Sequence, residues 1–185
     1  LKSKLDWPEN KIYLIKSFRF RIENKKNLSN KVYLPYVLEK KSLLLDRFKS
    51  FLISALPNSL PKFDIKIHSA MLDSSDHIKF KESLNKIMEA YKSRFSTKPI
   101  NENISIFFGV TASIFEALET GTKVVHICSE PLFQHFDDKI WPNLKTEKYD
   151  NGIYSYSLFS LGKYINFGTT NDTLQNTLKN ITLKK

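Results

Sequence analysis

The order of strand-like and helix-like segments is the feature of this chain that most constrains its fold. Repeatedly, a short run of branched and aromatic residues is followed by a longer segment in which apolar residues recur at helical spacing. Parallel strands need such crossover segments, so this alternation is typical of a parallel sheet with helices on both faces. The sequence therefore predicts an α/β domain that binds ligands at the carboxyl ends of its strands.

The expected elements can be placed by residue number. Strands are expected at residues 12–20, 32–37, 63–68, 104–108, 123–128 and 154–167. Helices are expected at residues 43–56, 80–95, 111–119, 132–141 and 172–181. Pro35 lacks an N–H group, which places it at a strand end or on an edge strand. No linker or internal repeat interrupts the 185 residues, so a single domain is expected.

The chain carries 29 Lys and Arg against 19 Asp and Glu, a net charge of +10. The basic residues are scattered, without a run of five and without a helix-turn-helix, zinc-finger or RNA-recognition signature. Nucleic acid is therefore not expected as a partner. The charge suits a phosphate-bearing substrate, an anionic glycan or peripheral contact with an anionic membrane.

The single cysteine, Cys128, cannot form an intrachain disulfide, which suits a reducing, cytoplasmic location, and it is expected to be buried. The longest apolar stretch, residues 104–115, is too short to span a bilayer. The chain begins with Leu1 and has no signal peptide, so a piece of a longer protein is expected.

Loops that follow expected strands hold the candidate site residues. Only 5 glycines occur, and no G-x-G-x-x-G or Walker A pattern is present. Gly109 permits a sharp turn after residues 104–108, and Thr111 and Ser113 then open a helix whose free N–H groups favour a phosphate. Glu116, three residues after Ser113, is either a capping-box partner of that serine or a ligand for ribose hydroxyls.

Other loops carry a histidine and further polar groups. His68 ends an expected strand and is either a ligand-binding residue or structural. Arg19 and Arg21 share a strand face and either bind a diphosphate or guard an edge strand. Glu130 and Gln134 lie in the loop that follows the strand expected at residues 123–128.

The remaining histidines are less persuasive as ligands. His126 is expected in the core, His135 on a helix and His77 in a solvated loop. No His, Cys or carboxylate pair has metal-ligand spacing, so no metal site is expected.

Residues 108–127, FGVTASIFEALETGTKVVHI, resemble the donor-binding segment of GT-B glycosyltransferases, which use nucleotide sugars and consist of two Rossmann-like domains. In that family a strand, a small-residue turn, a Ser/Thr-x-x-x-Glu-Ala helix and a glycine precede the next strand. The resemblance implies that Thr111 and Ser113 contact the donor phosphate and that Glu116 contacts the ribose. It also implies that the loop of Glu130 and Gln134 faces the donor sugar.

Residues 63–69, FDIKIHS, resemble the His-Pro motif of bacterial sialyltransferases and capsule polymerases, with Ser69 in place of the proline. This resemblance implies that His68 contacts the donor phosphate.

Together, these resemblances imply the carboxyl-terminal, Rossmann-like half of a metal-independent glycosyltransferase in bacterial surface-polysaccharide synthesis. Its donor would be a CMP- or UDP-linked sugar and its acceptor a glycan, with no cofactor. An amino-terminal domain would supply the catalytic base, and the enzyme would lie in the cytoplasm, peripheral to the inner membrane. Two alternatives remain: a non-catalytic basic module that binds nucleic acid or an anionic polymer, and a nucleotide-sugar epimerase.

Overall fold

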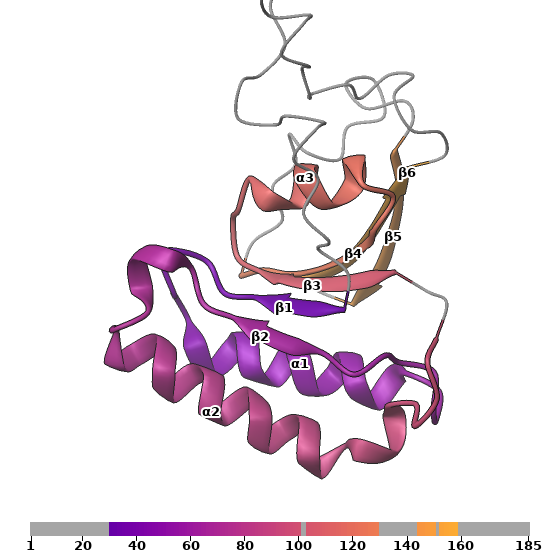
Figure 1. Ribbon diagram of the computed structural model, residues 1–185, viewed down its shortest axis with the longest axis horizontal. Coiled ribbons are helices and arrows are strands. Elements are labelled where there is room, and N and C mark those ends of the chain that lie inside the picture. The colour runs from indigo at the N-terminus through magenta and orange to yellow at the C-terminus, as the bar shows by residue number, and fades with distance from the viewer. Residues whose placement is uncertain (1–29, 101–102, 130–143, 151, 159–185) are drawn as a thin grey trace, which may run out of the picture. The chain divides into compact units, whose positions relative to one another are not determined.

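The computed structural model describes residues 30–100, 103–129, 144–150 and 152–158 (Figure 1). All of these residues lie within one compact unit, Lys26–Ile165. The strand expected at residues 12–20 and the helices expected at 132–141 and 172–181 lie outside the described residues. The strand expected at residues 154–167 is described only as far as residue 158.

Within the described residues, six strands form one sheet in the order β2-β1-β3-β4-β6-β5. β1 (Lys31–Tyr33), β2 (Asp64–Lys66), β3 (Ile104–Phe108) and β4 (Lys123–Ile127) are parallel. β6 (Ile153–Leu158) pairs antiparallel with β4, and β5 (Leu144–Asp150) pairs antiparallel with β6. The fold is therefore α/β and Rossmann-like, as predicted, with an antiparallel pair added beside the parallel strands.

Three α-helices connect the parallel strands in the described part of the chain: α1 (Lys41–Ser54), α2 (Ser75–Ala90) and α3 (Ser113–Glu119). α1 buries Leu44, Phe48, Phe51 and Leu52, which recur at the spacing of one helix face. α2 begins five residues before the predicted position, because Ser74 and Ser75 form a polar first turn that apolar periodicity does not detect.

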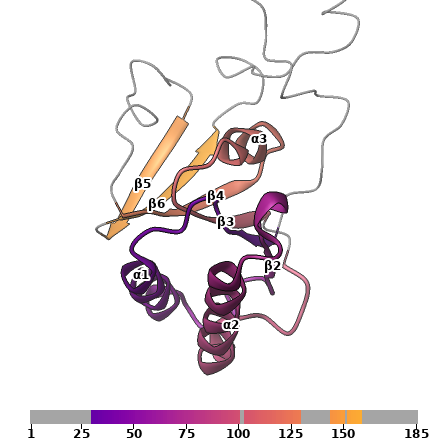
Figure 2. The same ribbon diagram turned by 90° about the vertical axis from the view of Figure 1, so that its left-hand side faces the viewer.

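The helices cover both faces of the sheet (Figures 1 and 2). On one face, the Phe108 ring of β3 lies 5.8 Å from the ring of Phe48 on α1 and 5.5 Å from that of Phe80 on α2. On the other face, α3 packs on β4 and β6 and buries Ile114 and Leu118. Burying a phenyl side chain contributes ~1.5–3 kcal/mol, so this aromatic cluster is a major part of the core.

The crossover connections do not all have the same hand. The α1 connection runs from β1 to β2, and the α2 connection runs back past β1 to β3. The two connections therefore cross the sheet in opposite directions, yet both helices pack on the face where Phe108 points. Their crossovers have opposite hands, although right-handed crossovers are the strong rule. The α3 connection runs in the same direction as the α2 connection but on the opposite face of the sheet, so it has the same hand as the α1 connection. The α2 crossover is therefore the one of opposite hand.

Candidate functional site

A cavity lies at the point where the strand order reverses, between β1 and β3. Open α/β sheets bind ligands there because the connections leave the two strands toward opposite sides. The cavity has a volume of about 260 Å³ and is called here the switch-point crevice. Its lining residues follow β1, β3 and β4, apart from one on α1: Tyr36, Val37, Glu39, Leu44, Gly109, Val110 and Ser129.

The turn at Gly109 forms one wall of the crevice and is held from three sides. Its φ is 60°, a left-handed conformation that suits glycine. Its N–H donates to the carbonyl of Ile127 at 2.8 Å, and its carbonyl accepts from Nε2 of His126 at 2.6 Å. A Cβ at this position would lie 3.4 Å from the ring of Pro35. His126 is fully buried, as predicted, and fixes the start of the β3–α3 connection.

The segment after β1 forms the opposite wall and is tied to α2 by a histidine. Nε2 of His77 donates to the carbonyl of Pro35 at 3.0 Å. Nδ1 of the same ring forms a hydrogen bond with the hydroxyl of Ser74, at 2.9 Å. The expectation that His77 is solvated was wrong: it is 4% exposed, because α2 begins at Ser75 and places it on the inner face of the helix.

The crevice combines an exposed apolar wall with one carboxylate. Tyr36, Val37 and Val110 are each more than half exposed, although their side chains are largely apolar. Glu39 is the single charged residue among those that line the crevice in the described chain. Apolar surface beside a hydrogen-bond acceptor suits a ligand that carries both a ring and hydroxyl groups. The lining therefore favours a ring that bears hydroxyl groups over a phosphate.

His68 lies next to the crevice and does not line it. It caps the short 3-10 helix Ser69–Met71, where its Nδ1 accepts from the N–H of Ala70 at 3.2 Å. This bond leaves the proton of the neutral ring on Nε2, which is therefore a donor. The ring lies edge-on to that of Tyr36, with centroids 5.5 Å apart. Tyr36 thus connects His68 to the crevice.

Thr111, Ser113 and Glu116 lie beyond the Gly109 turn, outside the crevice lining. The N-cap of α3 is Ala112, whose side chain makes no capping bond, and the N–H of Ser113 bonds to Oγ1 of Thr111 at 3.3 Å. Ser113 is thus the first residue of the helix and not its cap, so the capping-box alternative was wrong.

Glu116 lies near Tyr33 of β1. Burial and, second, the charge of Glu116 raise the pKa of Tyr33 to about 12.

Arg47 on α1 is a structural residue beside the crevice that the sequence reasoning did not identify. Its Nη1 donates to the carbonyl of Cys128 and, at 3.0 Å, to that of Ser129. This guanidinium fixes the segment that follows β4. Cys128 is 1% exposed, as predicted, and burial raises the pKa of its thiol to about 11, against a smaller lowering by Arg47.

Four predicted site residues lie outside the described residues: Arg19, Arg21, Glu130 and Gln134. His135, expected on a helix, also lies outside them. Among the described predictions, Gly109 alone lines the crevice.

Sequence reasoning missed Tyr36 and Val37, because it extended the strand to Val37, and it missed Glu39, which has no local signal of its own. The strand ends at Tyr33, and Pro35, which lacks an N–H group, was the signal that could have placed a loop there.

In the described part of the chain, no three His, Cys, Asp or Glu side chains are placed to hold a metal ion. Among the same residues, no helix has the length and apolar character needed to cross a membrane. No protein-family model, curated protein or solved structure matches this chain.

Proposed function

We propose that this chain is the donor-binding part of a metal-independent bacterial glycosyltransferase of the GT-B type. The carrying observation is the switch-point crevice at the carboxyl ends of β1, β3 and β4, the position at which Rossmann-like domains bind nucleotides. The β3–α3 segment that follows it has the sequence pattern of a donor-binding segment. Both features support the proposal that a CMP- or UDP-linked sugar binds at this end of the sheet.

The described residues have distinct roles in this proposal. Tyr36 and Val110 pack against the ring of the nucleoside, and Glu39 accepts hydrogen bonds from its hydroxyl groups. Thr111 and Ser113 contact the phosphate, with the Nε2–H group of His68 as a further donor. Glu116 is the alternative ribose ligand, although its position near Tyr33 favours Glu39 for this role.

The proposed reaction is transfer of the sugar to a hydroxyl group of a glycan. The bond between the anomeric carbon and the donor phosphate breaks, and a bond to the acceptor oxygen forms. Hydrogen-bond donors stabilise the negative charge that develops on the departing phosphate. The acceptor proton passes to a base on an amino-terminal domain, in an enzyme peripheral to the inner membrane on its cytoplasmic side.

Nucleotide binding to the whole chain tests this proposal. We expect CMP, UDP or CDP to raise the melting temperature, because a ligand that binds only the folded state stabilises it. Glu39→Gln and Ser113→Ala should each reduce the shift. Glu82→Gln is the matched control, since Glu82 is exposed on α2 and does not line the crevice.

Two results would overturn the proposal. One is the absence of a shift with all three nucleotides. The other is an equal shift in Glu39→Gln, Ser113→Ala and the control. A shift that Glu116→Gln removes and Glu39→Gln does not would reassign the ribose contact to α3.

A further inference from the structure

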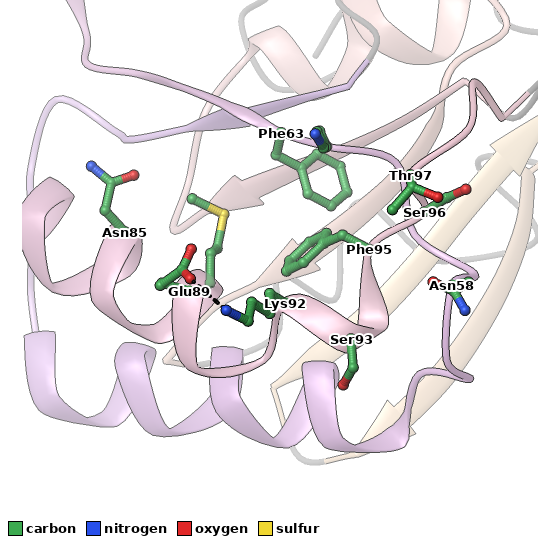
Figure 3. A pocket seen from close by; sticks show the side chains of 11 residues that line it. Asn58, Phe63, Asn85, Glu89, Lys92, Ser93, Phe95, Ser96 and Thr97 are labelled. Carbon is green, nitrogen blue, oxygen red and sulfur yellow. Dashed lines mark hydrogen bonds and ion pairs between the residues drawn. The ribbon is translucent and has the colours of Figure 1, made fainter.

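A larger cavity, of about 930 Å³, lies beside the amino-terminal end of β2 (Figure 3). The switch-point crevice, in contrast, lies at the carboxyl ends of β1, β3 and β4. The larger cavity is called here the edge groove, because β2 is the first strand in the sheet order. The carboxyl-terminal half of α2, the 3-10 helix Lys92–Arg94 and the segment before β2 form its walls. Its volume is at the upper end of the ~300–1,000 Å³ typical of ligand sites, enough for more than one sugar ring.

The floor of the edge groove is aromatic and held by backbone pairing. The rings of Phe63 and Phe95 meet edge-to-face, with centroids 6.1 Å apart. Leu60 pairs with Phe95 as an isolated parallel bridge, and the N–H of Ser96 donates to the carbonyl of Leu60 at 2.8 Å. The N–H of Asn58 donates to the carbonyl of Ser93 at 3.0 Å. These bonds hold the segment before β2 against the segment that follows α2, and the two segments together form one wall of the groove.

The rim consists mainly of uncharged hydrogen-bonding side chains. In Figure 3, Asn85 and Glu89 of α2 lie to one side of the two rings, and Asn58, Ser96 and Thr97 lie to the other. Amides and hydroxyls both donate and accept, which matches the hydroxyl groups of a sugar. The apolar C–H face of a sugar ring can at the same time pack on a phenyl ring.

The charged groups of the edge groove leave an excess of positive charge. Glu89 and Lys92 form an ion pair at 3.2 Å, and Lys62 also lines the groove. The lining residues therefore include two ammonium groups and one carboxylate, which gives them a net charge of +1. A ligand with carboxylate groups would complement it, and the net charge of +10 would help to attract such a ligand.

We propose that the edge groove binds an acidic oligosaccharide. Its sugar rings lie on the partly exposed Phe95, whose ring packs against the largely buried Phe63. Its hydroxyls meet the amide and hydroxyl rim, and a carboxylate contacts Lys62. The groove is separate from the switch-point crevice, so it would hold the glycan chain away from the position of transfer. That last role rests on the proposed function, whereas the binding itself follows from the lining.

Binding of the labelled full chain to an array of acidic oligosaccharides, neutral oligosaccharides and acidic peptides tests the inference. We expect acidic oligosaccharides to bind best. Asn85→Ala should weaken binding of all glycans by about tenfold through lost hydrogen bonds. Lys62→Ala should remove the preference for acidic over neutral glycans. Lys86→Ala, an exposed position on α2 outside the groove, should bind like the wild type.

The inference is overturned if no glycan binds, or if neutral glycans or acidic peptides bind as well as acidic glycans. It is also overturned if Lys86→Ala weakens binding as much as Asn85→Ala. The nucleotide shift of the same variants separates the two proposals. If the wild type binds nucleotide but no glycan, the groove proposal alone is overturned, and if it binds glycan but no nucleotide, the donor-site proposal alone is overturned. A groove variant such as Asn85→Ala should keep the nucleotide shift of the wild type.

Discussion

Gly109 and Gly152 both adopt a left-handed backbone conformation near the carboxyl ends of β3 and β4, but their surroundings differ. A Cβ on Gly109 would make an ordinary contact with Pro35, whereas a Cβ on Gly152 would overlap the carbonyl of Cys128 and the guanidinium of Arg47. Gly152 has a φ of 76°, so an alanine there would carry the backbone strain and the steric overlap together.

We therefore predict that Gly152→Ala destabilises the fold more than Gly109→Ala. The left-handed conformation alone should cost about 1–2 kcal/mol in Gly109→Ala. Gly152→Ala should cost a further ~1–3 kcal/mol from overpacking. Urea unfolding of both variants measures the difference. Equal losses would contradict the close packing of Arg47 and Cys128 against Gly152.

The residues of the candidate site show how far local sequence signals extend. His126 and Cys128 were placed correctly in the core, because each lies in a short apolar run whose burial is a local property. His77 was placed wrongly, because its polar neighbours concealed that it begins the inner face of α2. Glu39 carries no local signal, since it becomes a crevice residue only when β1 and β3 lie side by side.

At the scale of elements, α1 and α2 are joined by an ion pair between Lys41 and Asp76, at 2.9 Å. A hydrogen bond and the charge of Lys41 lower the pKa of Asp76 below its ordinary value of 3.8. A carboxyl group with a lowered pKa stabilises the fold above its unfolded pKa, and this contribution is lost as the pH falls through the folded pKa.

The pair should therefore contribute at neutral pH and disappear in acid. A double-mutant cycle with Asp76→Asn and Lys41→Gln should give a small favourable coupling at pH 7, small because both groups are exposed. The coupling should vanish as the pH is lowered below 3.8, the ordinary pKa of the Asp76 carboxyl, as far as the protein stays folded. Coupling that stays constant into acid would show that the contact is not ionic.

The described parallel strands and their helices were predictable because each carries its own apolar periodicity. β5 was not, since Leu144 is its one buried residue and the other side chains of LKTEKYD are polar or partly exposed. A strand of this kind forms because β6 offers it a hydrogen-bonding partner, which the local sequence does not reveal.

At the scale of the whole molecule, the net charge of +10 predicts weak attraction to any polyanion. We expect a short single-stranded oligonucleotide to bind weakly and to dissociate as the salt concentration rises from about 50 to 200 mM, because this binding depends on counterion release. Fluorescence anisotropy at several salt concentrations measures it. Sequence-dependent binding that resists salt would instead support the non-catalytic nucleic-acid module.

The sequence alone determined the class of the fold, because alternating strand and helix patterns are local and each must bury its apolar face. Tertiary structure decided which loops meet. Tyr36 and Val110 line one crevice because the parallel pairing of β1 and β3 brings distant segments together. It also decided the hand of the α2 crossover, which follows from the face on which Phe80 packs. The order of the strands and the sheet face on which each helix packs depend on non-local contacts, so the apolar periodicity along the chain does not encode them.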